Sequence, residues 1–279
     1  MSLKNPRAVS PGRTIAIAAI AVGAVVVGIP AVAIAVMMTE EVRGVVTVID
    51  TPQGKQEVYW RDYPGVAGLQ PSEVLSGPSL ERGEADGRAL LREIEEALTV
   101  EFGLEWAPPP TGNGDDVAFP TENSYGGMSM LSTLNIDGRQ STSVPTTWAE
   151  KERVMELVAE VAAEYGYGDL TLDHDADYMS EADLVQAYGA TSPEESVTVS
   201  GSLQGEAGQW LWFTITDLSL DRDGRFTEQA EESEQYGWQP NRISLLYGAN
   251  ALLPESARAE FDRRLAPFLG LPHPEPLES

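Results

Sequence analysis

The stretch ESVTVSGSLQGEAGQWLWFTIT, residues 195–216, decides the fold, because two runs of alternating side chains flank a glycine-rich turn. Successive side chains of a β-strand point to opposite faces of its sheet. The two faces of the second run consist of Leu211, Phe213 and Ile215 on one side and Trp210, Trp212 and Thr214 on the other. The pattern predicts two long antiparallel strands joined near residues 205–208.

Further strands are predicted from short β-branched or aromatic runs elsewhere in the chain. They lie at about 128–136, within DLTLDHD at 169–175, and at 243–247. A separate hairpin is predicted at 45–61, because two such runs there flank the turn sequence TPQG.

Three amphipathic helices are predicted to cover this sheet. The first spans 86–103, with an apolar stripe at Leu91, Ile94, Leu98 and Phe102. The second spans 147–166, where Thr147 and Glu150 have the spacing of a capping box and Gly166 ends the helix. The third spans 253–270, with Pro254 in its first turn and an apolar face formed by Ala257, Phe261, Leu265 and Phe268. Together these elements predict an α+β fold with helices on one face of a mainly antiparallel sheet.

A long apolar segment precedes this folded part. Residues 14–38 contain no charged side chain, and 25 helical residues reach roughly 37 Å, whereas the hydrocarbon core of a bilayer is about 30 Å thick. The segment is therefore predicted to be an uncleaved transmembrane helix. Two alternatives remain open: a cleaved secretory signal, for which Ala31, Ala33 and Ala35 supply small residues, and a buried helix of a soluble protein.

The residues that flank this segment predict its orientation. Lys4, Arg7 and Arg13 precede it, and Glu40 and Glu41 follow it. Because basic residues favour the cytoplasmic side of a membrane, we expect a single-pass protein of the cell membrane. The expected organisation is a cytoplasmic tail 1–13, a transmembrane helix 14–38, a membrane-proximal hairpin and linker 39–80, an extracytoplasmic α+β domain 81–270 and a flexible tail 271–279.

The net charge and the absence of cysteine exclude several classes of partner and of catalytic chemistry. The chain carries 44 acidic against 18 basic residues, a formal net charge of −26. Such a surface repels phosphate backbones, so nucleic acid is not an expected partner. The chain has no cysteine, which excludes disulfides, thiol catalysis, thiolate metal sites and lipid attachment through an N-terminal cysteine.

Three stretches of the chain carry a resemblance to a known family. They are LEWAPPPTGNG at 104–114, NSYGGMSML at 123–131, and the helix that starts at Trp148 and ends in YGYGDLTLDHD. This arrangement resembles the LppA-type lipoproteins of actinobacterial cell envelopes. The resemblance implies an anchored extracytoplasmic domain and transfers no catalytic residue. Those lipoproteins carry an acylated cysteine, in whose place this chain has the apolar segment.

Candidate catalytic and metal-binding residues are few. The chain has two histidines: His174 is expected to be partly buried and hydrogen-bonded, and His273 lies in a proline-rich tail. The most suggestive carboxylates are Asp173, Asp175 and Asp177, whose alternate spacing matches the first three ligands of a calcium loop. There the turn glycine and the last ligand are missing, since Tyr178 and Leu184 occupy their positions. A second stretch has Asp221, Asp223 and the turn glycine Gly224, but Ala230 occupies the position of the last ligand. A solvated acidic turn is the alternative at both places.

The remaining candidates for ligand contact are Trp210 and Trp212. They could form a stacking surface for sugar or peptidoglycan if their face of the sheet is open, or they could lie under a helix. We find no nucleophile elbow, P-loop or dinucleotide motif, so no catalytic residue and no cofactor is expected. The predicted function is a non-catalytic, membrane-anchored protein that interacts with another membrane or cell-wall component of the bacterial envelope. The alternatives are a calcium- or glycan-binding module, or a hydrolase without a recognisable motif.

Overall fold

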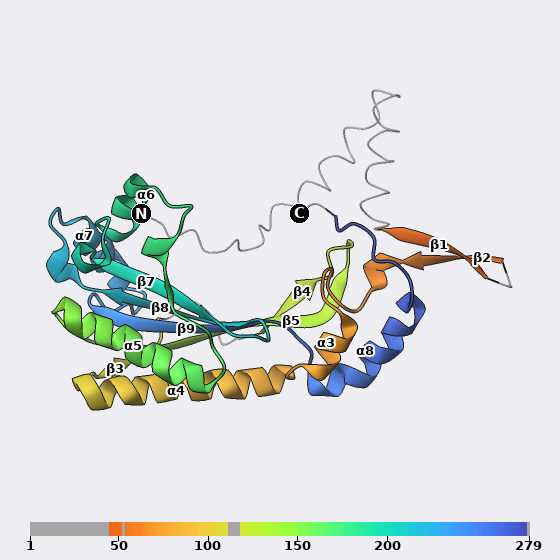
Figure 1. Cartoon of the computed structure of the whole chain (residues 1–279), viewed down its shortest axis with the longest axis horizontal. Helices are drawn as coiled ribbons and strands as arrows, with labels where there is room; N and C mark the ends of the chain where they lie inside the picture. Colours follow the sequence, from red (N-terminus) through yellow and green to blue (C-terminus); the bar gives the residue numbers. More distant parts are fainter. Residues whose placement is uncertain (1–44, 52–53, 111–117, 278–279) are drawn as a thin grey trace, which may run out of the picture. The chain divides into compact units, whose positions relative to one another are not determined.

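The structure is a computed structural model that describes residues 45–51, 54–110 and 118–277 (Figure 1). The predicted cytoplasmic tail 1–13 and transmembrane segment 14–38 lie outside these residues. Within the described ranges, no helix combines the length and the apolar composition that crossing a bilayer requires.

The described residues form two compact units. The first, which we call the hairpin unit, contains the residues up to Gly68 together with 122–129 and 260–277; the second, the sheet unit, contains 69–121 and 130–259. Two segments that are distant in sequence therefore join the hairpin in the first unit.

The predicted hairpin is confirmed. Strand β1 (Val46–Thr51) pairs antiparallel with β2 (Gly54–Tyr59), and Val46 lies opposite Tyr59. A short 3-10 helix, η1 (Trp60–Asp62), follows.

Asn123 and a cluster of aromatic rings hold the rest of the hairpin unit together. The side-chain amide of Asn123, which is fully buried, lies 3.0–3.1 Å from the carbonyl oxygens of Trp60, Arg61 and Tyr63. The cluster consists of Trp60, Tyr63, Tyr125, Phe268 and His273. His273, which we assigned to a flexible tail, packs 5.2 Å from the Trp60 ring and lies 3.1 Å from the Tyr125 hydroxyl.

The sheet unit is built on a seven-stranded sheet in the order β3-β5-β9-β8-β7-β6, with β4 also paired to β5. The strands are β3 (Trp106–Ala107), β4 (Ala118–Glu122), β5 (Met128–Ser141), β6 (Thr171–Leu172), β7 (Thr198–Gln204), β8 (Gln209–Thr216) and β9 (Arg242–Leu252). Every pairing along the main path is antiparallel. The predicted α+β class with a mainly antiparallel sheet is therefore confirmed.

Two long helices cover one face of β7, β8 and β9 (Figure 1). They are α4 (Leu80–Phe102) and α5 (Trp148–Glu164). The predicted capping box is present at the start of α5, where Thr147 and Glu150 bond each other's backbone N–H groups. The predicted core faces are also confirmed, since Ile94, Leu98 and Val158 are fully buried in the main hydrophobic cluster.

Helix α4 begins six residues before the start that we predicted. The Ser79 side chain caps it by accepting a hydrogen bond from the Arg82 N–H at 3.2 Å. Gly83 and Gly87, which weaken helix propensity, lie inside it and are buried. A β-carbon on Gly87 would lie 2.4 Å from the Tyr247 ring, so the glycine lets α4 approach β9 closely.

Several short helices complete the chain and were not predicted individually. They are α3 (Pro71–Ser76), η2 (Asp173–Asp175), α6 (Glu181–Tyr188), η3 (Pro193–Glu195), η4 (Leu218–Leu220) and α7 (Arg225–Glu234). The predicted C-terminal helix is present as three consecutive pieces: η5 (Glu255–Ala257), α8 (Arg258–Leu265) and η6 (Ala266–Phe268).

Candidate functional site

The two strands that opened the sequence analysis place Trp210 and Trp212 on the sheet face opposite α4 and α5. Leu211 and Phe213 on β8 are buried in the core, whereas Trp212 is 39% exposed. The two long helices therefore do not cover this tryptophan. Figure 1 shows both long helices on the other side of β7, β8 and β9.

The pairing registers define what surrounds the two tryptophans. Trp212 lies between Ser202 on β7 and Leu246 on β9, and Trp210 lies between Gln204 and Gly248. We call this surface the tryptophan face; its members are Asn135, Asp137, Ser200, Ser202, Gln204, Trp210, Trp212, Thr214, Ser244, Leu246 and Gly248.

Gly248 determines how Trp210 lies. A β-carbon at this position would lie 2.1 Å from the indole ring, so the ring rests directly on the strand backbone. Trp210 is half-buried as a result, and its neighbour Trp212 projects further into solvent. The two indoles thus form a step of apolar surface on the side of the sheet that α4 and α5 leave uncovered.

The polar members of the tryptophan face are almost all neutral. Asp137 is the one acidic side chain among them, although the chain as a whole is strongly acidic. The hydroxyl oxygens of Ser200 and Thr214 lie 3.2 Å apart, and the buried Asn135 Oδ1 has no hydrogen-bond partner within the described part. Indole rings beside hydroxyl and amide groups match the alternating C–H and O–H surfaces of a sugar ring.

The three aspartates proposed as calcium ligands do not converge. Asp173 accepts a hydrogen bond from the Tyr188 hydroxyl at 2.8 Å, and Asp175 and Asp177 are exposed. Across the residues that the structure describes, no group of three or more acidic or histidine side chains is placed to hold a metal ion. The predicted strand ends at Leu172 and continues as the 3-10 helix η2, which removes the alternation on which the calcium prediction relied.

The second acidic turn caps a helix. The Asp221 carboxylate accepts hydrogen bonds from the backbone N–H and the hydroxyl of Thr227, both at 2.8 Å. The Asp223 carboxylate accepts one from the N–H of Arg225. These contacts satisfy orphan N–H groups at the start of α7, which is the local role that aspartate usually has at a helix N-terminus.

His174 is partly buried and hydrogen-bonded, as predicted. Its Nε2 lies 2.9 Å from the Ser196 Oγ, and that hydroxyl donates to the Ser192 carbonyl at 2.8 Å. Because the single hydroxyl proton of Ser196 points to the Ser192 carbonyl oxygen, the Nε2–H of His174 donates to the Ser196 Oγ. A catalytic serine–histidine pair requires the opposite direction, with the histidine accepting the serine proton.

The protonation of His174 agrees with this structural role. Burial lowers the pKa of His174 below its ordinary value, although Asp173 and Asp175 act in the opposite direction. The neutral ring packs against Tyr188, with a centroid distance of 4.8 Å. His174 therefore ties η2 to α6 and to the chain entering β7.

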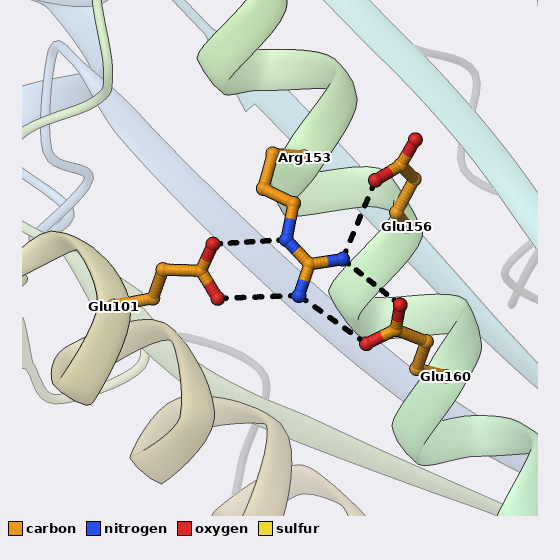
Figure 2. A network of polar contacts seen from close by, with 4 residues as sticks. All are labelled: Glu101, Arg153, Glu156 and Glu160. Atoms are coloured by element: carbon orange, nitrogen blue, oxygen red, sulfur yellow. Dashed lines mark hydrogen bonds and ion pairs between the residues drawn. The ribbon is translucent and has the colours of Figure 1, made fainter.

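Two ion-pair clusters fix α5 on the helical side of the sheet. Figure 2 shows Arg153 between Glu101 on α4 and two glutamates of its own helix, Glu156 and Glu160. The hydrogen bonds that the Arg153 guanidinium donates to these three carboxylates raise the pKa of Arg153, and the cluster is largely exposed. It links two helices across their outer surface.

The second is a buried ion pair in the first turn of α5, two residues before Arg153. The Lys151 Nζ lies 2.5 Å from the Asp217 Oδ2, and both side chains are 4% exposed. Burial alone would raise the pKa of Asp217, but hydrogen bonds from Lys151 and Ser219 outweigh it and lower the pKa below its ordinary value. The pair ties the first turn of α5 to the residue that follows β8.

A pocket that no sequence motif indicated lies at the opposite end of β8 from Asp217. Its lining includes Asp86, Tyr165, Tyr167, Gln209 and Tyr247. Four elements contribute these side chains, so no local motif could have revealed it. Only two sequence features point to this region: the aromatic turn YGY at 165–167, and the spacing of Gly83 and Gly87 in α4. Compared with family models, curated proteins and solved structures, the chain matches none of them.

Proposed function

We propose that this chain is a non-catalytic, membrane-anchored protein of the bacterial cell envelope, and that its tryptophan face binds a glycan of the cell wall. The observation that carries the proposal is the exposure of Trp212 on a nearly neutral face of an otherwise acidic protein. The N-terminal segment 14–38 would hold the chain in the cytoplasmic membrane, with the folded units outside.

The location follows from the sequence. An uncharged run of 25 residues flanked by basic residues on one side and acidic residues on the other favours a single span with its C-terminal side outside. A glycan partner is then available on the same side of the membrane as the tryptophan face. The resemblance to LppA-type envelope lipoproteins supports the same location.

The chemistry of the face favours a neutral, hydroxyl-rich ligand. A basic partner would be drawn to the many acidic residues elsewhere, and an anionic one would be repelled by them. Trp210 and Trp212 offer apolar rings, while Ser202, Gln204 and Ser244 offer hydrogen-bonding groups beside them. Aromatic side chains of this kind supply large contact area with little loss of side-chain freedom.

Sedimentation with purified peptidoglycan tests the proposal, with the full-length protein in mild detergent. We expect the wild-type chain to co-sediment and Trp212→Ala to bind at least about fivefold more weakly, as expected for a central aromatic contact worth roughly 1 kcal/mol or more. The matched control is Tyr178→Ala, because Tyr178 is an exposed aromatic residue outside the tryptophan face.

Unchanged binding after removal of both indoles would contradict the proposal. If a chain carrying both Trp210→Ala and Trp212→Ala sediments with peptidoglycan as strongly as the wild type, the tryptophan face is not the binding surface. Retention that disappears equally in the Tyr178 control would indicate non-specific adsorption and would also overturn the assignment.

A further inference from the structure

The pocket at the far end of β8 lies within the sheet unit, on the helical side of the sheet. Asp86 on α4, Tyr165 and Tyr167 after α5, Gln209 on β8 and Tyr247 on β9 contribute to its lining. Its empty space is about 460 Å³, which includes the solvent at its mouth. The tryptophan face is on the opposite side of the same strands, so this is a separate site.

The backbone holds the aromatic walls in place. Tyr167 is bridged to Gly205 across the turn between β7 and β8, and its side chain is 7% exposed. Tyr247 is 4% exposed and lies against α4, where Gly87 leaves room for its ring. The Gln209 side chain folds over Gly205, since a β-carbon there would lie 2.4 Å from the Gln209 Cδ.

Two polar atoms in this lining lack a partner among the described residues. They are the Tyr167 hydroxyl and the Gln209 Oε1, and both are buried. Leaving a buried polar group without a hydrogen bond costs roughly 1–3 kcal/mol, so folded proteins seldom retain two of them in the lining of one pocket without a use for them. The amide oxygen can only accept a hydrogen bond, so its missing partner is a donor.

Charge around the pocket is negative. Burial raises the pKa of Tyr247 to about 12, and the carboxylate of Asp86 adds to this effect. Burial and a hydrogen bond to Glu93 raise the pKa of Tyr165 to about 12, with a further contribution from Asp86. Arg82 pairs with Asp86 at 2.7 Å, but its side chain is largely exposed and can turn away into solvent.

We propose that this tyrosine pocket binds a primary alkylammonium group. The Gln209 amide oxygen, the Tyr167 hydroxyl oxygen and the Asp86 carboxylate would accept its N–H groups, and the tyrosine rings would face its methylene chain and its charge. The ammonium replaces the exposed Arg82 side chain at Asp86, an exchange that costs little because exposed ion pairs are weak.

Other ligand classes fit the lining less well. A carboxylate or phosphate would be repelled by Asp86 and would leave the Gln209 acceptor without a donor. A neutral diol could donate to that oxygen but would not gain the charge interaction with Asp86. Comparing the affinities of an alkylammonium, a carboxylate and a neutral diol for the pocket therefore tests the proposal.

Calorimetry with cadaverine, pentanediol and glutarate makes this comparison, since the three probes share a five-carbon chain and differ in charge. With the full-length protein in detergent, we expect saturable binding of cadaverine that weakens as salt concentration rises, and no saturation with glutarate. Nα-acetyl-lysine, which keeps its side-chain ammonium, is a fourth probe and shows whether the site also accepts a lysine side chain. Pentanediol binding as tightly as cadaverine, or the absence of saturation with cadaverine, would overturn the proposal.

Two conservative variants separate binding from folding. Asp86→Asn should weaken cadaverine binding about tenfold, the value of a lost charge-assisted hydrogen bond, whereas Asp175→Asn, at an exposed site outside the pocket, should not change it. Tyr167→Phe should leave the ligand-free protein as stable or more stable, because it removes an unpaired buried hydroxyl, while reducing the stabilisation by cadaverine. A Tyr167→Phe protein that loses stability without ligand and binds cadaverine normally would show that the hydroxyl is structural.

Discussion

Trp212 and Phe213 are consecutive residues of β8, yet Trp212 is 39% exposed and Phe213 is 1% exposed. The register explains the difference, because Trp212 lies beside Ser202 and Leu246 on the open face, and Phe213 belongs to the core cluster on the helical side. One strand therefore supplies both the stability of the sheet unit and its candidate binding surface.

This alternation predicts a contrast in stability. Phe213→Ala should lower the free energy of unfolding by about 3–5 kcal/mol, because it removes a fully buried aromatic ring. Trp212→Ala should lower it by about 1 kcal/mol, since much of that ring is already in contact with water. Urea denaturation of both variants measures the difference, and equal losses would contradict the assignment of the two faces.

The buried ion pair predicts an asymmetric effect of substitution. Lys151→Met leaves the Asp217 carboxylate buried without its partner and should cost about 3–5 kcal/mol. Adding Asp217→Asn, which keeps an acceptor for the Ser219 N–H, should recover part of this loss. The control is Arg263→Met at an exposed ion pair, where the change should be small. Strictly additive losses in the double variant would show that the two groups do not interact.

The same pair predicts a pH dependence with a defined sign. Because the pKa of Asp217 is lower in the folded chain than in the unfolded chain, the pair contributes its full stabilisation above the ordinary aspartate pKa of about 3.9. This contribution is lost as the pH falls below that value through the folded pKa. The stability difference between wild type and Asp217→Asn should therefore be constant from about pH 7 to pH 5 and shrink below about pH 4. A difference that grows on acidification would reverse the assigned direction of the shift.

The close contact between α4 and β9 predicts that a better helix former will destabilise the protein. Gly87→Ala improves helix propensity by about 0.5–1 kcal/mol, but its β-carbon would lie 2.4 Å from the Tyr247 ring. Overpacking of this kind costs about 1–3 kcal/mol, so a net loss of stability is expected. Tyr247→Leu in the same background should relieve the clash. A stabilised Gly87→Ala protein would show that the ring can move aside.

The periodicity of the sequence was sufficient to predict the central strands and the second long helix. The alternation in β8 predicted both of its faces, and Thr147 with Glu150 predicted the start of α5, because each signal is local to a few neighbouring residues. The start of α4 was missed because Gly83 counts against a helix unless its tertiary contact is known: a β-carbon there would lie 2.8 Å from the Leu252 side chain. Helix α6 was not predicted, although Ser180 and Asp183 form a capping box, because its eight residues are too few to give a clear helical period.

The candidate sites were predictable to different degrees. The sequence identified Trp210 and Trp212 as a possible surface, but whether their face was open depended on where α4 and α5 pack. The tyrosine pocket could not be predicted, because Asp86, Gln209 and Tyr247 come from separate elements. The hydrogen bond from Tyr188 to Asp173 likewise required the fold of α6 onto η2.

Protease accessibility in intact bacterial spheroplasts tests whether the folded units lie outside the cytoplasmic membrane. The account predicts that added protease degrades the folded units of the full-length chain without lysis and leaves a short membrane-embedded fragment that contains residues 14–38. A full-length chain that stays intact until the spheroplasts are lysed would contradict the account.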